Sequence, residues 1–275
     1  MKSRLLSSAA ITAIAALGLH APAQAQSRAT PYSWSGFYVG LNAGHAWGNS
    51  NATTATDCSL SAQPPGYLCT SAIPAAADVA LFTGAGTGSI DARGFTGGIQ
   101  FGHNWQLDRL VYGFEADYGA LRLSNSRQAS SAYTNTGIQG TAAFGFASTA
   151  STDWLATVRG RLGVTLPSYN LLAYATGGVA WTRLTVTNSY SDSAIGYGAG
   201  TANDLKTGFA IGGGLEWACG AHWTVKGEYL YVDFGKVTAY GTFTSTAGGG
   251  GYSQGFSTSS DLTAHVARVG INYKF

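Results

Sequence analysis

The sequence predicts an all-β protein, an eight-stranded antiparallel up-and-down barrel that crosses a membrane with its strands. Hydrophobicity alternates with period two in eight segments, and the connections between those segments are alternately long and short. Only 10% of the 275 residues are charged, against about 25% in a typical soluble domain. The 39 glycines disfavour a helical protein, because each glycine inside a helix costs roughly 1 kcal/mol.

Residues 1–25 have the pattern of a secretory signal peptide. Lys2 and Arg4 precede the apolar stretch Leu5–Leu19, and Ala23-Gln24-Ala25 forms an A-x-A cleavage site. An uncleaved anchor is the weaker alternative, because 15 residues fall short of the ~20 that span a bilayer as a helix. Removal of this segment leaves 13 basic and 13 acidic residues. A balanced charge predicts no nucleic-acid partner.

Residues 26–35 are expected to be a short periplasmic N-terminal segment, and residues 36–275 to form the outer-membrane barrel. Each predicted strand is long enough to cross a membrane at a tilt. In the first, the odd positions from Phe37 to Trp47 form an apolar row and the even positions a polar one. The eight predicted strands are Gly36–Gly48, Gly94–Trp105, Leu110–Leu123, Trp154–Leu166, Leu171–Leu184, Gly208–Ala218, Trp223–Phe234 and Leu262–Phe275.

The connections predict how the barrel lies in the membrane. Four of them are long and rich in Ser, Thr, Ala, Gly and Asn, whereas the other three have about four residues each. Membrane barrels have long extracellular loops and short periplasmic turns. A soluble barrel would turn its apolar rows inward, and a soluble sandwich would not explain where the charges lie. The predicted extracellular loops are about 49–93, 124–153, 185–207 and 235–261.

Tryptophans stand at or just beyond the predicted strand ends. The indole ring is apolar but has a polar N–H group, so it prefers the membrane–water interface. We therefore expect two aromatic girdles, made of Trp34, Trp105, Trp217 and Trp223 at the periplasmic rim and Trp47, Trp154 and Trp181 at the other.

Charged residues on the strands fall mostly on the polar rows, which face the lumen. Glu115 and Asp117 share a strand face and could act as an acid/base pair. A structural plug is the favoured interpretation, because an eight-stranded barrel is just wide enough for side chains to fill it and buried charges must be paired. The predicted lumen network is Glu115, Asp117, Arg159, Arg161, Glu216, Lys226, Glu228 and Arg268. No enzymatic activity is expected.

Three segments resemble the small outer-membrane immunogenic proteins of alphaproteobacteria, a porin-like group with haemin-binding members. They are Trp34–Gly40 (WSGFYVG), Lys226–Asp233 (KGEYLYVD) and the ending Val269–Phe275 (VGINYKF). The resemblance implies an eight-stranded barrel with both termini in the periplasm. Tyr273 and Phe275 are also similar to the signal that the outer-membrane assembly machinery reads.

His45 and His265 are candidate haem ligands on account of that resemblance. Strands one and eight must pair to close a barrel, so these two histidines can approach each other near the outer rim. Two separate interfacial histidines are the commoner arrangement. Ala267 stands where a lipid A deacylase would have its serine. No cofactor and no metal site are predicted.

Three cysteines remain in the exported chain. Cys58 and Cys69 flank the turn-forming Pro64-Pro65-Gly66 in the first long loop, whereas Cys219 belongs to a short turn on the opposite side of the membrane. A disulfide between Cys58 and Cys69 is therefore the one pairing that a single barrel permits.

The sequence favours a surface-exposed structural outer-membrane protein that contributes to envelope integrity. A haemin-binding or adhesion protein that acts through its extracellular loops is the main alternative, and a low-conductance pore for small solutes is a third. Expected partners are outer-membrane lipid and lipopolysaccharide, the barrel-assembly machinery, and in the alternative case haemin or a host surface.

Overall fold

The computed structural model describes residues 32–57, 75–133, 142–193, 196–245 and 252–275. Residues Tyr32–Phe275 form one compact unit. The predicted signal peptide and the predicted disulfide between Cys58 and Cys69 lie outside the described residues, so both stay predictions.

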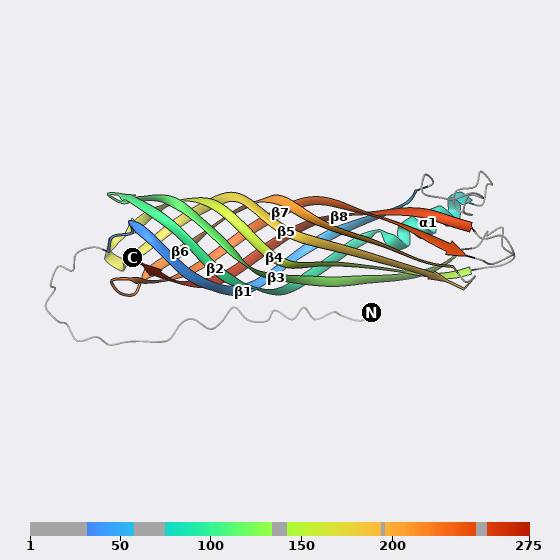
Figure 1. Cartoon of the computed structure of the whole chain (residues 1–275), viewed down its shortest axis with the longest axis horizontal. Coiled ribbons are helices and arrows are strands. Elements are labelled where there is room, and N and C mark those ends of the chain that lie inside the picture. Colours follow the sequence, from blue (N-terminus) through green and yellow to red (C-terminus); the bar gives the residue numbers. More distant parts are fainter. Residues whose placement is uncertain (1–31, 58–74, 134–141, 194–195, 246–251) are drawn as a thin grey trace, which may run out of the picture. The chain divides into compact units, whose positions relative to one another are not determined.

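The described residues form eight long antiparallel strands, and each strand pairs with its neighbour in the sequence. The first strand also pairs with the last, so the sheet closes into a barrel without a free edge (Figure 1). The predicted eight-stranded antiparallel barrel is thereby confirmed. In chain order the elements are β1 (Gly36–Asp57), α1 (Ala75–Gly86), β2 (Gly88–Leu107), β3 (Leu110–Tyr133), β4 (Ala142–Leu166), β5 (Leu171–Asp192), β6 (Tyr197–Ala218), β7 (Trp223–Ser245) and β8 (Tyr252–Lys274).

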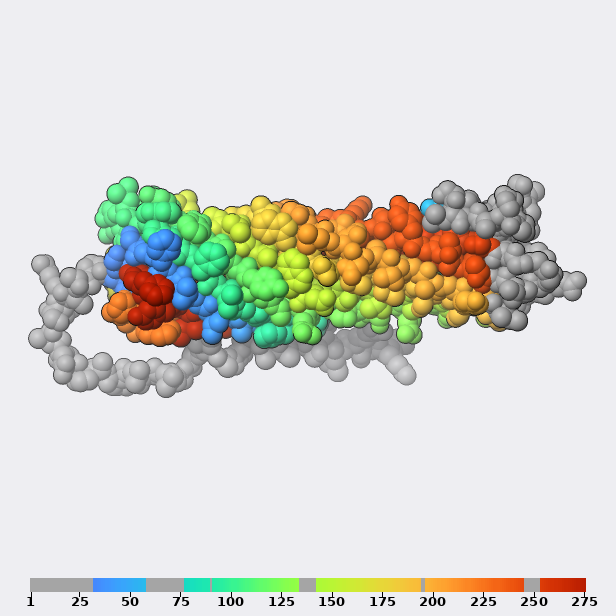
Figure 2. Space-filling view, in the orientation of Figure 1, coloured from blue at the N-terminus to red at the C-terminus, as the bar shows by residue number. Residues whose placement is uncertain are grey.

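The two ends of the barrel differ. β1 begins and β8 finishes at the same end, whereas α1 lies towards the other (Figure 1). Figure 2 shows the first strand and the C-terminal residues side by side. We call the end with Gly36 and Lys274 the terminal end, and the end with α1 the distal end. Turns at the terminal end are tight, and Asp108 and Asn170 adopt left-handed backbone conformations there, with φ of 55° and 51°.

The strands have 20 to 25 residues, about twice the predicted length. Much of the predicted loop sequence is therefore strand, and three of the four predicted long loops were wrong. The first connection, between Asp57 and Gly88, is still long and contains α1. β1 continues to Asp57, β3 to Tyr133, β5 to Asp192 and β7 to Ser245. Small and hydroxyl-bearing residues dominate these extensions, so their alternation of hydrophobicity is too weak to distinguish a strand from a loop.

The outer wall of the barrel is apolar in the terminal half and polar in the distal half. In the terminal half of β4, Val158 and Leu162 are exposed on the outer wall while Arg159 is buried in the lumen. In the distal half of the same strand, Phe144 and Phe146 are buried inside. The outer wall of the distal half is polar, with exposed hydroxyl residues that include Ser124, Ser126, Ser130, Thr187, Ser189, Thr242 and Thr244.

The terminal half thus presents an apolar wall of the kind that contacts lipid, and the distal half presents a polar wall of the kind that contacts water. A register irregularity between Thr152 and Leu155 lies at this change on β4, and similar ones occur on β3, β6 and β7. A bulge of this kind re-aims the side chains that follow it.

α1 was not predicted, because it lies in a segment that has loop composition. Its residues, Ala75–Gly86, fall within the predicted first loop of about 49–93. In the part of the chain that the structure describes, no helix has both the length and the apolar character needed to span a bilayer.

Candidate functional site

The eight charged residues predicted to face the lumen all lie there, on five strands, and all are buried. β3, β4 and β6 to β8 carry them at positions where alternate residues turn inward. Four are basic and four acidic, so their formal charges cancel. The structure brings all eight together into one network, which we call the lumen network.

Arg159 lies among three carboxylates. Its Nη2 is 2.7 Å from Glu115 Oε1 and 2.9 Å from Asp117 Oδ2, and its Nη1 is 3.2 Å from Glu228 Oε1. Thr157 Oγ1 accepts a hydrogen bond from Arg159 Nε at 2.9 Å. The fork of a guanidinium matches several carboxylates at once, and here only 1% of its side-chain surface is exposed.

The remaining cations join the same carboxylates. Lys226 Nζ lies 2.7 Å from Glu115 Oε2. Arg268 Nη2 is 2.6 Å from Glu228 Oε2, and Arg268 Nη1 is 3.0 Å from Asp117 Oδ1. Each of these three carboxylates is therefore shared between cations from different strands, so the network links strands on different sides of the barrel.

Two tyrosines complete the network, and sequence reasoning missed both. Tyr38 Oη donates to Glu115 Oε2 at 2.8 Å, and Tyr174 Oη donates to Glu228 Oε1 at 2.9 Å. Arg161 forms an ion pair with Glu216 at 2.6 Å, and its guanidinium carbon lies 4.0 Å from the centre of the Tyr174 ring. The signal was available, because both tyrosines belong to inward-facing rows.

The geometry supports a structural network rather than an acid/base pair. Glu115 and Asp117 are both held by cations within 3 Å, which keeps neither free to exchange a proton with a substrate. Among the described residues, no group of three or more His, Cys, Asp or Glu side chains could hold a metal ion.

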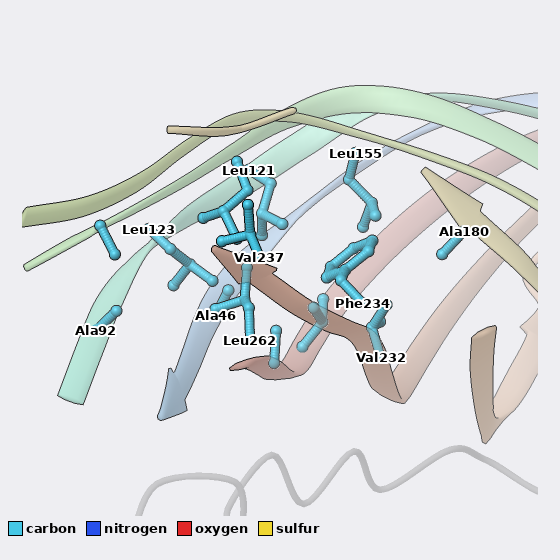
Figure 3. Packing of buried hydrophobic residues seen from close by; sticks show 14 of the residues in the cluster. Ala46, Ala92, Leu121, Leu123, Leu155, Ala180, Val232, Phe234, Val237 and Leu262 are labelled. Carbon is cyan, nitrogen blue, oxygen red and sulfur yellow. The ribbon is translucent and has the colours of Figure 1, made fainter. Parts of the chain in front are cut away.

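An apolar layer fills the lumen on the distal side of the network. Along β7, the inward row passes from Lys226 and Glu228 to Leu230, Val232 and Phe234. Side chains from other strands point towards the same centre, as Figure 3 shows. The labelled members of this apolar layer are Ala46, Ala92, Leu121, Leu123, Leu155, Ala180, Val232, Phe234, Val237 and Leu262.

A second apolar cluster lies inside the distal half, and α1 supplies its centre. Phe82 has no exposed surface, and its ring centre lies 5.7 to 6.3 Å from five other aromatic rings. We call this group the distal aromatic cluster; around Phe82 it contains Tyr133, Phe144, Phe146, Tyr190, Phe243 and Phe256.

Two polar contacts hold the end of α1 against the inner wall. Thr54 Oγ1 donates to Gly86 O at 3.0 Å, and Arg127 donates to Ala85 O. A Cβ atom at Gly86 would come within 2.5 Å of Thr54, so a glycine is needed for this close approach. The glycine at this position is therefore a packing requirement rather than a sign of flexibility.

The residues before β1 close the terminal end. Trp34 is only 3% exposed and packs with Val111, Leu172, Tyr174 and Ala218. Its assignment to the periplasmic girdle was therefore wrong, because the indole turns into the lumen and its backbone N donates to Gln106 Oε1 at 2.8 Å. The Tyr32 ring lies beside it, and burial raises the pKa of Tyr32 to about 12.

The other six tryptophans lie on the outer wall. Trp47, Trp105, Trp217 and Trp223 are exposed, while Trp154 and Trp181 are half-buried. Tyr273 packs edge-on against Trp223 with ring centres 5.1 Å apart. Phe275 is 70% exposed, and its backbone N donates to Phe37 O at 3.0 Å.

The histidines proposed as haem ligands share an outer-wall patch with Trp47. His265 lies opposite Trp47 in the β1–β8 register, and the Trp47 ring stacks on both His45 and His265 at 6.0 and 5.7 Å. Tyr229 Oη and His265 Nδ1 are 2.6 Å apart. The two imidazoles thus contact an indole and a phenol, and their role as haem ligands stays untested. Cys219 is an exposed free thiol.

Comparison with known proteins gives the same assignment as the fold. A model of the outer membrane protein beta-barrel domain matches residues 11–275. The 31 kDa outer-membrane immunogenic protein of Brucella melitensis is 31% identical over 246 residues, which cover 89% of this chain and 85% of that one. The 25 kDa outer-membrane immunogenic protein of Brucella abortus is 23% identical over 283 residues, which cover 100% and 99% of the two chains.

Among solved structures, the outer membrane protein OprG of Pseudomonas aeruginosa is 11% identical and covers 98% of its own chain and 89% of this one, with a TM-score of 0.41. The match to the family model over residues 11–275 and the 31% identity with a Brucella protein agree with the closed barrel and the apolar wall of its terminal half. This chain belongs to the outer-membrane β-barrel family, in which the outer-membrane immunogenic proteins are its relatives, and it is a protein of the bacterial outer membrane.

Proposed function

We propose that this protein is a structural, non-conducting outer-membrane protein that contributes to envelope integrity and projects its distal half from the cell surface. The filled lumen is the observation that carries the proposal. Charged, aliphatic and aromatic side chains occupy it at successive levels, namely in the lumen network, the apolar layer and the distal aromatic cluster.

The orientation in this proposal follows from the outer wall. A polar wall is stable only in water, so the distal half stands outside the hydrocarbon core of the membrane. β1 continues beyond Trp47 to Asp57, and β5 continues beyond Trp181 to Asp192, whereas the terminal end has only tight turns. The terminal end therefore faces the periplasm, and the distal half faces the outside of the cell.

Such a barrel supports the envelope mechanically and sterically. Its continuous backbone hydrogen bonding and its cross-lumen ion pairs resist deformation of the wall, and no catalytic step is required of it. A low-conductance pore, the alternative, would require the side chains of the lumen network and the apolar layer to move aside and open a continuous channel. Adhesion or haemin binding would instead use the outer surface of the distal half.

The test combines conductance with envelope function. Purified protein in a planar bilayer should show no conductance steps, and a strain that lacks the gene should become more sensitive to detergents and large antibiotics. Wild-type protein and Ser130→Ala, a change on the exposed distal wall, should both restore resistance.

Two outcomes would overturn the proposal. Stable conductance steps in the wild-type protein would favour the pore, and unchanged envelope resistance in the deletion strain would remove the structural role. A stoichiometric absorbance change on haemin titration of the folded barrel would favour the binding alternative.

A further inference from the structure

We propose that the outer wall formed by β1, β2, β3, β7 and β8 binds one phosphorylated, multiply acylated lipid of the lipid A type. An apolar groove on this wall would take the acyl chains, and an arginine pair at the distal end of the groove would take a phosphate. The assignment of the lipid to the outer leaflet rests on the proposed orientation of the barrel.

The groove has a cavity volume of about 700 Å³ and is open to the outside. Ala43 on β1 lies opposite Gly97 on one side and Val269 on the other, so two very small side chains form its floor. Leu41 and Ile99 stand beside these two residues, and the Phe95 ring lies over Gly97, where a Cβ atom would come within 2.7 Å of it. All three side chains are exposed by 54 to 60%. A groove lined by small, branched and aromatic residues of this kind fits a hydrocarbon chain.

Three side chains that can carry positive charge surround Phe95 at the distal end of this groove. His45 lies opposite Phe95 on β1, Arg122 lies opposite it on β3, and Arg93 is the next outward residue along β2. All three are exposed on the outer wall. Within the described residues, no carboxylate lies within ion-pair distance of either guanidinium, although Asp91 faces outward two positions beyond Arg93.

The position of this arginine pair matches the charge pattern of an outer-leaflet lipid. Along β2, the outward row passes from Arg93 to Phe95, Gly97 and Ile99, so cationic and apolar surfaces meet within about two residues. The phosphates of such a lipid lie at the edge of the hydrocarbon layer, where this change occurs. Guanidinium groups bind phosphate through paired hydrogen bonds, and an unpaired arginine there is available to do so.

The experiment measures how the detergent-extracted, full-length barrel binds two probes, diphosphoryl lipid A and monophosphoryl lipid A, by native mass spectrometry. We expect one bound molecule and about tenfold tighter binding of the diphosphoryl form, because two charge-assisted contacts depend on the phosphates. The double variant Arg93→Gln/Arg122→Gln should bind both lipids with equal affinity. Ala43→Leu, which fills the floor of the groove, should weaken the binding of both.

Arg183→Gln is the matched control, because Arg183 is an exposed outward arginine on β5, three strands away from β2. It should keep the wild-type preference. Equal binding of the two lipids by the wild type, an equal loss in the control, or unchanged binding in Ala43→Leu would each overturn the proposed site. None of these measurements depends on which end of the barrel faces the outside, so a wrong orientation would be detected separately by surface labelling.

Discussion

At the scale of single residues, the lumen shows why a buried ion network can be stable only as a whole. Arg159 has three carboxylates within 3.2 Å, and Tyr38 and Tyr174 donate to two of these same carboxylates. Taking so many charges out of water is costly, and the cost is offset only while every partner is present. A single missing cation leaves uncompensated negative charge in a closed space.

Arg159→Ala should therefore destabilise the folded barrel by roughly 3–5 kcal/mol, because it leaves the carboxylates around it underpaired. The measurement is the temperature at which the folded band disappears on unboiled dodecyl sulfate gels. Ser130→Ala, on the exposed distal wall, is the control and should leave that temperature unchanged. If both variants melt with the wild type, the lumen is hydrated and the charges are not a plug.

Trp34 supplies a second residue-scale prediction. Its indole packs against Leu172 and Tyr174 at the terminal end, so Trp34→Ala should remove about 3–5 kcal/mol of packing free energy from this end. Trp223→Ala, which truncates an exposed tryptophan, should cost less. Hydrogen exchange of the first residues of β1 reports the difference, and equal exchange in the two variants would place Trp34 outside the lumen.

At the scale of elements, α1 depends on the barrel as much as the barrel depends on α1. The helix has 12 residues, too few to be stable alone in water, and its central Phe82 is buried among rings from four strands. The helix thus serves as an internal plug of the distal half.

Phe82→Ala should loosen α1 and open the distal half to proteases while the terminal half stays folded. Limited proteolysis of intact cells checks this, with fragments expected from cleavage near α1. Tyr240→Ala truncates an exposed aromatic residue of the same half and should leave the protease pattern unchanged. Cleavage that is the same in both variants would mean that Phe82 does not hold the helix.

At the scale of the whole molecule, the closed sheet and the change from an apolar to a polar outer wall along the strands support the proposed orientation in the membrane. Closure satisfies the backbone hydrogen bonds of every strand, which a membrane demands, and the change from apolar to polar wall defines one end as the water-exposed one. Cys219 belongs to the terminal end and Ser130 to the distal half, so thiol labelling can distinguish the two.

A thiol reagent that cannot cross the outer membrane should label Cys219 only after the cells are broken. In a variant with Cys58→Ser and Cys69→Ser, the further change Ser130→Cys should give a thiol that reacts on intact cells. Labelling of Cys219 on intact cells would invert the proposed orientation. In the unsubstituted protein, reaction of Cys58 and Cys69 only after reduction would establish the predicted disulfide.

The strands of the terminal half and the lumen network could be predicted from the sequence, because apolar and polar residues alternate regularly in this half. Apolar residues face outward and charged residues face the lumen, which gives rows as regular as the one from Phe37 to Trp47. The same alternation predicted the inward direction of all eight members of the lumen network, and all eight are buried. This alternation failed as a guide in the distal half, where polar residues face outward and aromatic residues face the lumen. Small hydroxyl residues also make the alternation of hydrophobicity weak there.

The sequence by itself determined the strand count, the closure of the barrel and the inward direction of its charges, because these follow from the period of a strand and the cost of a charge in lipid. The tertiary structure alone decided that the strands run to 20–25 residues, that Phe82 of α1 fills the distal lumen and that Trp34 turns inward. Each of these depends on contacts between residues far apart in the chain. A local pattern carries no record of which distant surface will cover a side chain.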